Sequence, residues 1–270
     1  MADIAHEAEI AGIAHEAEIA GWDGFFLWDH LMIRKNTPFC DPWISLAAIA
    51  MKTSKIKIGT MVTPLPRRRP WQLAREIVSL DHLSNGRVIL GVGIGDPPSE
   101  FSTFGDEKNA FIRGKMLDEG LEILRGLWSG SPFKYEGEYF KIRKVKFLPK
   151  PVNNHIPIWI AGLWPNKKPF LRASKYDGVC PNSVRYPDIL SPKELKEAMS
   201  YIKQNRNKTN NYDVYFAGDT PEDKYQASKV VEKYKEAGAT WWSENINYIR
   251  FDNSPKKMLE RIRKGPPKID

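Results

Sequence analysis

One stretch constrains the fold more than any other: an apolar strand that ends in glycines and lies between two helical segments. Residues 88–92 read Val-Ile-Leu-Gly-Val, and Gly93-Ile94-Gly95 follows directly. A strand without polar positions is typical of a parallel sheet whose two faces are covered by helices. The glycines either form a tight turn or let a ligand approach the backbone closely. The stretch therefore predicts an α/β fold.

The same alternation of strand and helix runs along the whole chain. Strands are expected at residues 25–28, 56–62, 88–92, 156–161, 177–181, 212–217 and 239–243, with helices between them. Three of the helices are expected to start at Asp41-Pro42, at the capping box of Ser191 and Glu194, and at Thr220-Pro221. This order predicts a single domain over residues 1–270, either an open parallel sheet or a (β/α)8 barrel that lacks one strand. Residues 133–141 alternate around a Glu-Gly turn instead, which predicts a surface hairpin within an insertion of residues 131–156.

The chain begins with a duplicated nonapeptide. Residues 4–12 and 13–21 both read IAHEAEIAG. Nine residues turn an α-helix by about 900°, so one continuous helix places the two Ile/Ala stripes on opposite sides. Only one copy can then pack normally, unless Gly12 breaks the helix. We expect the second copy to be the packed helix and residues 1–12 to be an added helical segment.

Composition and charge narrow the range of partners. The net charge is +8, but the basic residues are scattered apart from Arg67-Arg68-Arg69, so we expect no nucleic-acid partner. That cluster is either solvated or holds one anionic ligand. No apolar run approaches the roughly 18 residues that span a membrane. Cys40 and Cys180 form neither a metal-ligand spacing nor a disulfide framework. Without such a spacing we expect no bound metal. Because the first twenty residues contain no Lys or Arg, we expect a cytoplasmic protein without a secretory signal.

Five segments in chain order resemble the bacterial-luciferase-like flavin-dependent oxidoreductases: AEIAGWDGFFLWDH, IGTMVTPLPRRRPWQLARE, LDHLSNGRVILGVGIG, YEGEYFK and PIWIAG. The superfamily includes FMN-dependent monooxygenases and enzymes that use the deazaflavin coenzyme F-420. The resemblance implies a (β/α)8 barrel with an insertion before the fifth strand, a small-molecule substrate, transfer of hydride or oxygen, and a homodimer. FMN and F-420 both remain open, and an FMN enzyme would need a flavin reductase.

The resemblance also implies roles for single residues. His30 matches an active-site histidine that handles the proton accompanying hydride transfer, with a backbone-bonded structural histidine as the alternative. Asp29 would orient it or shape the pocket. Residues Thr60, Met61 and Val62 match a bulge behind the cofactor ring, with a non-prolyl cis peptide expected between Met61 and Val62. An ordinary trans strand end is the alternative.

Further cofactor contacts are implied at two later turns. Gly93 and Gly95 would lie near the ring, and Asp96 would handle a proton with His30 or simply cap a turn. Gly162, Lys168 and Arg172 would bind the cofactor phosphate at a helix N-terminus, unless they form a solvated helix start.

The chain departs from the resemblance at its start, where the duplicated nonapeptide replaces the first strand of the barrel. This departure favours a second hypothesis, a degenerate non-catalytic relative that acts as a weak flavin-binding or structural homodimer.

Overall fold

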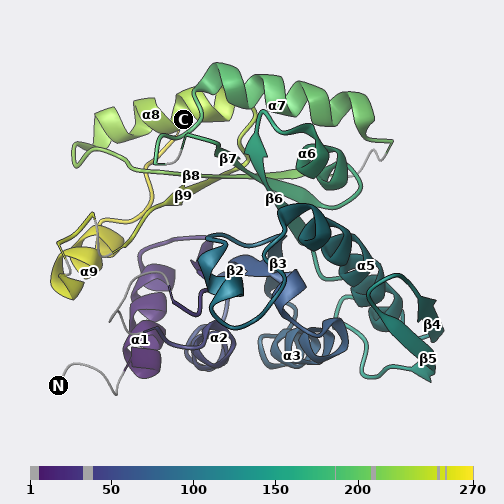
Figure 1. The fold of residues 1–270 in the computed structure, drawn as a ribbon. Helices are drawn as coiled ribbons and strands as arrows, with labels where there is room; N and C mark the ends of the chain where they lie inside the picture. Colours follow the sequence, from purple (N-terminus) through teal and green to yellow (C-terminus); the bar gives the residue numbers. More distant parts are fainter. Residues whose placement is uncertain are drawn as a thin grey trace. The chain divides into compact units, whose positions relative to one another are not determined.

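A computed structural model describes residues 6–32, 39–185, 187–207, 211–247, 250–252 and 254–269. The chain divides into two compact units, which are described separately below. The first unit comprises Met1–His15 with Asp23–Ile156, and the second comprises Glu16–Trp22 with Pro157–Asp270. Both alternate parallel strands with helices, as the sequence predicted (Figure 1).

The first unit contains three parallel strands in chain order: β1 (Gly24–Leu27), β2 (Lys57–Pro64) and β3 (Val88–Gly93). Helices α2 (Pro42–Lys52) and α3 (Pro70–Leu83) connect them and lie on one side of the strands (Figure 1). Every residue of β3 is buried, as its apolar sequence predicted. The long helix α5 (Ala110–Trp128) packs on α3, where the Trp128 indole donates to the Ala74 carbonyl at 3.2 Å.

The second unit contains four parallel strands: β6 (Ile158–Trp164), β7 (Gly178–Ser183), β8 (Asp213–Gly218) and β9 (Trp241–Glu244). Helices α6 (Lys167–Ala173), α7 (Pro192–Asn205) and α8 (Lys224–Glu236) lie on one side of these strands, and α9 (Pro255–Arg263) follows (Figure 1). Aromatic stacking attaches α8 to the strands, because the rings of Tyr234 and Phe216 lie 4.3 Å apart.

Helix α1 (His6–Ile19) runs through Gly12 without a break, so both copies of the nonapeptide contribute to one helix. Its buried side chains include Ala11, Ala14 and Ala17, a stripe at helical spacing that falls mainly in the second copy. This confirms that the second copy packs. Within the described residues α1 is the only element before β1, and no strand precedes it there; residues 1–5 lie outside the described part.

The open space around Gly12 gives a first prediction. A Cβ atom at this position would meet nothing within 4 Å, and the residue lies inside a helix. Gly12→Ala should therefore raise the free energy of unfolding by about 0.5–1 kcal/mol, measured by urea denaturation. Gly59→Ala is the matched control with the opposite sign, because its Cβ would collide with the Ile89 carbonyl oxygen. Loss of stability in the Gly12 variant would contradict the continuous helix.

Local signals placed most helix starts correctly. The Asp41 carboxylate accepts from the backbone N–H groups of Trp43 and Ile44 at the start of α2, as the Asp-Pro pair predicted. The capping box of Ser191 and Glu194 is present at the start of α7. The predicted start of α8 at Thr220-Pro221 is wrong, because Asp223 caps the helix and the helix begins at Lys224.

The predicted hairpin is present as β4 (Pro132–Glu136) and β5 (Lys141–Lys146). A carboxylate on α5 holds its turn: Glu119 accepts from the backbone N–H groups of Glu138, Tyr139 and Phe140 at 2.7, 3.1 and 3.0 Å. Consecutive N–H groups that converge in this way form an anion-binding nest. A Cβ at Gly137 would collide with the Glu119 carboxylate. The Tyr-Glu-Gly-Glu-Tyr-Phe segment thus docks the insertion on α5.

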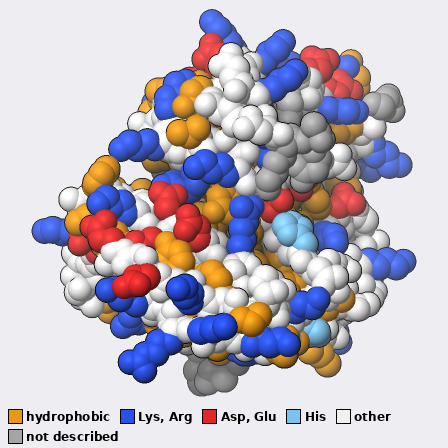
Figure 2. All heavy atoms as spheres, turned by 90° about the vertical axis from the view of Figure 1, so that its right-hand side faces the viewer, with side chains coloured by type: hydrophobic (Ala, Val, Ile, Leu, Met, Phe, Trp, Pro, Cys, Tyr) orange, Lys and Arg blue, Asp and Glu red, His pale blue; other side chains and the backbone are white. Residues whose placement is uncertain are grey.

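The surface carries mixed charge. On the face drawn in Figure 2, blue Lys and Arg side chains are spread out, with red acidic side chains among them. Among the described residues, no helix has the length and apolar character needed to cross a membrane. The same part of the chain contains no group of three or more His, Cys, Asp or Glu side chains suited to a metal ion.

Candidate functional site

A buried carboxylate organises the edge of the first unit at which its parallel strands end. Asp29 follows β1 and is 2% exposed. The Thr63 hydroxyl, from the end of β2, donates to Asp29 Oδ2 at 2.8 Å. Arg68 donates to both carboxylate oxygens at 3.1 and 3.0 Å, and Arg67 donates to Oδ1 at 3.1 Å. Asp29 therefore pairs with two arginines and joins the loop after β1 to the end of β2.

A second buried carboxylate reaches the same cluster. Glu100 lies on the short helix α4 (Ser99–Ser102) and is 1% exposed. Arg67 donates to Glu100 Oε2 at 2.8 Å, so this arginine bridges Glu100 and Asp29. The Met32 backbone N–H donates to Oε1 at 2.7 Å, and His30 Nδ1 lies 3.2 Å from Oε2. We call Asp29, Thr63, Arg67, Arg68 and Glu100 the ion cluster.

The His30 side chain keeps a ring nitrogen that has no partner among the described residues. Its side chain is 25% exposed, and its Nδ1 faces Glu100. The Trp28 and Phe39 rings approach its imidazole edge to face, with centroids 6.3 and 6.4 Å away. Nε2 has no hydrogen-bond partner among the described residues. A ligand can therefore exchange a proton or a hydrogen bond with Nε2.

The predicted bulge follows in β2. Thr60 pairs with Leu90 and Thr63 with Val92, so β2 has one residue more than β3 over this interval. The Met61–Val62 peptide is cis, which confirms the prediction for this bond. The ion cluster holds the end of the bulge, because the Thr63 hydroxyl that donates to Asp29 also lies 2.9 Å from the Thr60 hydroxyl. The side chains of Met61 and Val62 are half-buried.

The turn after β3 contains Gly95 and Asp96. Gly95 has a φ of 83°, and a Cβ there would collide with the Phe101 ring, so this position requires glycine. Asp96 is exposed and its carboxylate makes no hydrogen bond to a described residue. The carboxylate that contacts His30 is Glu100 instead. A proton-handling role for Asp96 stays a prediction, as does proximity of Gly93 and Gly95 to a cofactor.

Arg113 of α5 contacts this turn through its guanidinium group. Its guanidinium donates to the carbonyls of Lys108 and Gly95 at 2.9 and 3.3 Å and lies 4.0 Å from the Phe101 ring centroid. Burial lowers the pKa of Arg113, while the negative charge of Asp96 acts in the opposite direction. Arg113 therefore places a positive charge near the predicted proton-handling carboxylate.

In the second unit, Gly162 is a packing residue. It lies inside β6, which continues to Trp164, so the predicted strand end at Gly162 is wrong. A Cβ there would lie 2.9 Å from Pro169 Cβ on α6, so the glycine allows the helix to approach the strand. Lys168 is exposed in the first turn of α6 and Arg172 is half-buried in its last. Phosphate binding by Gly162, Lys168 and Arg172 stays a prediction.

The end of β9 carries a buried carboxylate of its own. Glu244 accepts from the Thr220 backbone N–H at 3.0 Å and from the Trp242 indole at 3.1 Å. It also pairs with Arg250 and Arg261. Burial acts to raise the pKa of Glu244, but these donors and cations outweigh it and hold the pKa below its ordinary value. The ionised carboxylate thus stabilises the folded state.

This gives a pH-dependent prediction for Glu244→Gln. Because the folded-state pKa is lowered, the stabilisation is complete above the ordinary value of 4.5 and is lost as the pH falls through the folded-state pKa. The variant should be about 2–3 kcal/mol less stable than the unmodified protein at neutral pH. That difference should narrow below pH 4.5, measured by urea denaturation over a pH series. Glu222→Gln, whose side chain is 93% exposed, should show no such difference.

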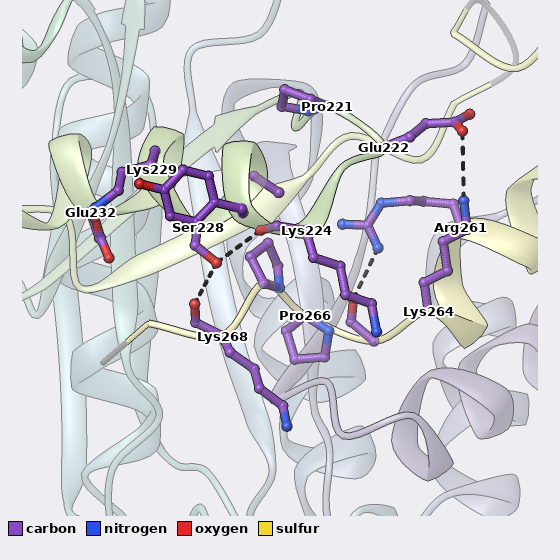
Figure 3. A pocket seen from close by; sticks show the side chains of 14 residues that line it. Pro221, Glu222, Lys224, Ser228, Lys229, Glu232, Arg261, Lys264, Pro266 and Lys268 are labelled. Atoms are coloured by element: carbon purple, nitrogen blue, oxygen red, sulfur yellow. Dashed lines mark hydrogen bonds and ion pairs between the residues drawn. The ribbon is translucent and has the colours of Figure 1, made fainter.

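A cavity of about 460 Å³ lies elsewhere in the second unit, between the first turns of α8 and the segment after α9 (Figure 3). The Ser228 hydroxyl joins its walls by donating to the Lys268 carbonyl at 2.6 Å. Glu222 pairs with Lys264 at 3.9 Å across its rim (Figure 3). None of the residues predicted to form the functional site lines this cavity.

Comparison with known proteins identifies the family. The sequence model of luciferase-like monooxygenases matches residues 3–191. The chain belongs to the luciferase-like monooxygenase family. It is 32% identical over 145 residues to an F-420-dependent glucose-6-phosphate dehydrogenase of Amycolatopsis mediterranei, an alignment that covers 52% of this chain and 43% of the relative. The chain spans about half the length of the curated relatives it matches.

Solved structures show that the luciferase-like fold extends over nearly the whole chain. A coenzyme F-420-dependent tetrahydromethanopterin reductase from Methanopyrus kandleri matches with a TM-score of 0.75 and 18% identity, covering 96% of this chain and 94% of that one. The oxygenating constituent of 3,6-diketocamphane monooxygenase from Pseudomonas putida, solved with FMN, matches with a TM-score of 0.68 and 20% identity, covering 98% and 74%. The predicted α/β fold of the luciferase-like barrel type is therefore confirmed.

The sequence did not single out Glu100 or the pairing of Arg67 and Arg68 with Asp29. The run of three arginines was a signal, because adjacent cations require anions nearby when they are buried. Glu100 carried no comparable signal. It is 70 residues from His30 in the chain, and only the parallel arrangement of β1 and β3 brings the two loops together.

Proposed function

We propose that the protein is an oxidoreductase that uses F-420 to transfer hydride to or from a small organic substrate, with His30 as the proton-handling residue. The observation that carries this proposal is the connection between His30 and the bulge. Glu100 and Arg67 join His30 to Asp29, and Asp29 joins Thr63 at the end of the bulge. A rigid network of this kind holds an acid–base group in a fixed position relative to a neighbouring strand end.

The residues of the first unit fit a deazaflavin or flavin ring. Met61 and Val62 offer half-buried apolar side chains, which suit the face of a planar heteroaromatic ring. His30 offers an imidazole nitrogen that no described residue contacts, and the exposed Asp96 offers a second titratable group. When bound, the cofactor supplies the hydride chemistry. The protein supplies orientation and a proton acceptor or donor at His30 Nε2.

Two further points favour F-420 over FMN. The curated relative quoted above and the structure with the higher TM-score are both described as F-420-dependent. Hydride transfer to or from a hydroxyl or carbonyl carbon requires a proton partner, which His30 can provide. FMN remains the alternative, because the neighbour from Pseudomonas putida was solved with FMN.

The test is a paired titration of the purified protein with F-420 and with FMN, followed by cofactor absorbance and tryptophan fluorescence. Saturable micromolar binding of F-420 and not of FMN is the expected result. Preference for FMN would replace F-420 with an FMN-dependent activity that needs reduced flavin. Failure of both, in protein that is folded by circular dichroism, would favour the degenerate, non-catalytic relative.

A further inference from the structure

The cavity between the first turns of α8 and the segment after α9 has walls that the fold holds together (Figure 3). The Ser228 hydroxyl ties α8 to the Lys268 carbonyl, and the Arg261 guanidinium donates to the Gly265 carbonyl at 3.0 Å. A Cβ at Gly265 would lie 2.8 Å from the Ala20 carbonyl oxygen, so the segment after α9 packs closely on the chain before β1. The volume of about 460 Å³ falls within the range of small-molecule sites, roughly 300–1,000 Å³.

Positive charge dominates the lining of this cavity. Among the described residues, five cationic side chains and two carboxylates line it. Both carboxylates already have a lysine partner. Lys229 pairs with Glu232 at 3.0 Å, and Lys264 pairs with Glu222 at 3.9 Å. Lys224 makes no ion pair with a described residue, and its side chain points from α8 toward the segment after α9 (Figure 3). The cavity therefore offers an ammonium group whose charge no carboxylate balances.

A second cation in the lining is buried and fixed. Arg261 is 9% exposed, and its guanidinium lies 3.2 Å from the Glu244 carboxylate and donates to the Thr220 hydroxyl at 3.2 Å. A guanidinium group has five N–H donors, and the Nε of Arg261 makes no hydrogen bond to a described residue. Arg261 therefore keeps a donor for a ligand while Glu244 holds the side chain in place.

Apolar surface completes the lining. The Tyr225 ring is 66% exposed on the first turn of α8, where Lys229 Nζ lies 5.4 Å from its centroid. Three prolines line the cavity as well: Pro221, Pro266 and Pro267. A flat apolar group packs favourably against an aromatic ring. The cavity thus suits a molecule that combines an anionic end with a flat apolar part.

We propose that this cavity binds a small organic phosphate, with the phosphate group on Lys224 and Arg261 and the apolar part against Tyr225. A phosphate monoester carries about −1.5 to −2 charge near neutral pH and has three acceptor oxygens, so it can engage an ammonium and a guanidinium group together. A carboxylate has one charge and two oxygens and matches these cations less well. Lys264 can turn toward the same phosphate, because an exposed ion pair such as the one with Glu222 is weak.

The test is a titration of the whole protein with phenyl phosphate, followed by ¹H–¹⁵N correlation NMR. Saturable shifts confined to the amides that line the cavity, including those of Tyr225, Ser228 and Gly265, are the expected result. Benzoate carries the same ring with a single charge and should bind at least about fivefold more weakly. Because the charged groups are largely exposed, added salt should weaken the binding of phenyl phosphate.

Substitutions separate the two parts of the site. Lys224→Gln should raise the Kd for phenyl phosphate about tenfold, the effect of losing one charge-assisted hydrogen bond. Lys233→Gln is the matched control, because Lys233 is exposed on the same helix but does not line the cavity, and it should leave the Kd unchanged. Tyr225→Ala should weaken binding of phenyl phosphate several-fold and leave binding of inorganic phosphate unchanged. All three side chains are exposed, so the variants should fold, which circular dichroism checks.

A titration without saturable shifts in the cavity would overturn the proposal. Equal effects of Lys224→Gln and Lys233→Gln would also overturn it, since they would indicate non-specific attraction to a basic surface. Benzoate that binds as tightly as phenyl phosphate would refute the assignment to phosphates. None of these outcomes depends on F-420 or FMN, so a protein that binds phenyl phosphate here but neither cofactor would refute the proposed function alone.

Discussion

Arg87→Met is expected to lower the free energy of unfolding by about 3 kcal/mol or more. Arg87 immediately precedes β3 and is 7% exposed, yet it carries a charge. Its guanidinium donates to one hydroxyl and four backbone carbonyls. These acceptors are Thr53 Oγ1 and the carbonyls of Ala50, Thr53, Ile56 and Ser84, at 2.7–3.0 Å. Methionine fills a similar volume but leaves these buried acceptors without their donor.

The Arg87 network joins the end of α2 to the starts of β2 and β3. The measurement is the urea midpoint together with the m-value, since an unchanged m-value shows that the change is in stability alone. Arg87→Lys keeps the positive charge but has fewer hydrogen-bond donors. It should therefore lower the free energy of unfolding by less than Arg87→Met does. Arg75→Met is the matched control, because Arg75 lies on the surface, where it donates to the Leu148 carbonyl and lies 4.1 Å from the Phe147 ring centroid; it should change stability by less than about 1 kcal/mol. Equal effects of Arg87→Met and Arg75→Met would contradict this account.

The elements that the sequence predicted well depend on local chemistry. The apolar run of β3, the Asp41 cap of α2 and the capping box at Ser191 are each specified by neighbours in the chain. The cis peptide at Met61–Val62 was predicted from the resemblance, since nothing in the residue types alone required it. Local signals failed at α8, where Thr220 and Asp223 are both suitable N-cap residues. The structure uses Asp223 as the cap.

The ion pairs within the site could not be predicted from the sequence, because they join residues that are far apart in the chain. Arg67 bridges two carboxylates, Asp29 and Glu100, that are 71 residues apart in the chain, and nothing in the spacing indicates that both are buried. Gly12 shows the same limit in a helix. The sequence left open whether Gly12, which costs a helix about 1 kcal/mol, breaks it. The unbroken helix buries Ala11, Ala14 and Ala17 along one continuous face, and this burial offsets the cost of the glycine.

His30→Asn is expected to reduce kcat with the identified cofactor by about 10²–10⁴-fold while changing cofactor affinity only a few-fold. Asparagine still reaches toward Glu100 with an amide donor, so the ion cluster and the bulge should persist. It has no group that accepts a proton near neutral pH, however, so the proton that accompanies hydride transfer loses its acceptor. Single-turnover rates measured from cofactor absorbance separate this chemical step from binding.

His155→Asn is the control for His30→Asn, because His155 is exposed in the segment before β6 and should leave kcat unchanged. Asp96→Asn distinguishes the two titratable groups of the site. A large decrease in kcat for His30→Asn, together with a small decrease for Asp96→Asn, would indicate that His30 is the proton acceptor and that Asp96 is a turn residue. The reverse result would transfer the role to Asp96, whose carboxylate has no hydrogen-bond partner among the described residues, and would leave His30 as a structural neighbour of Glu100.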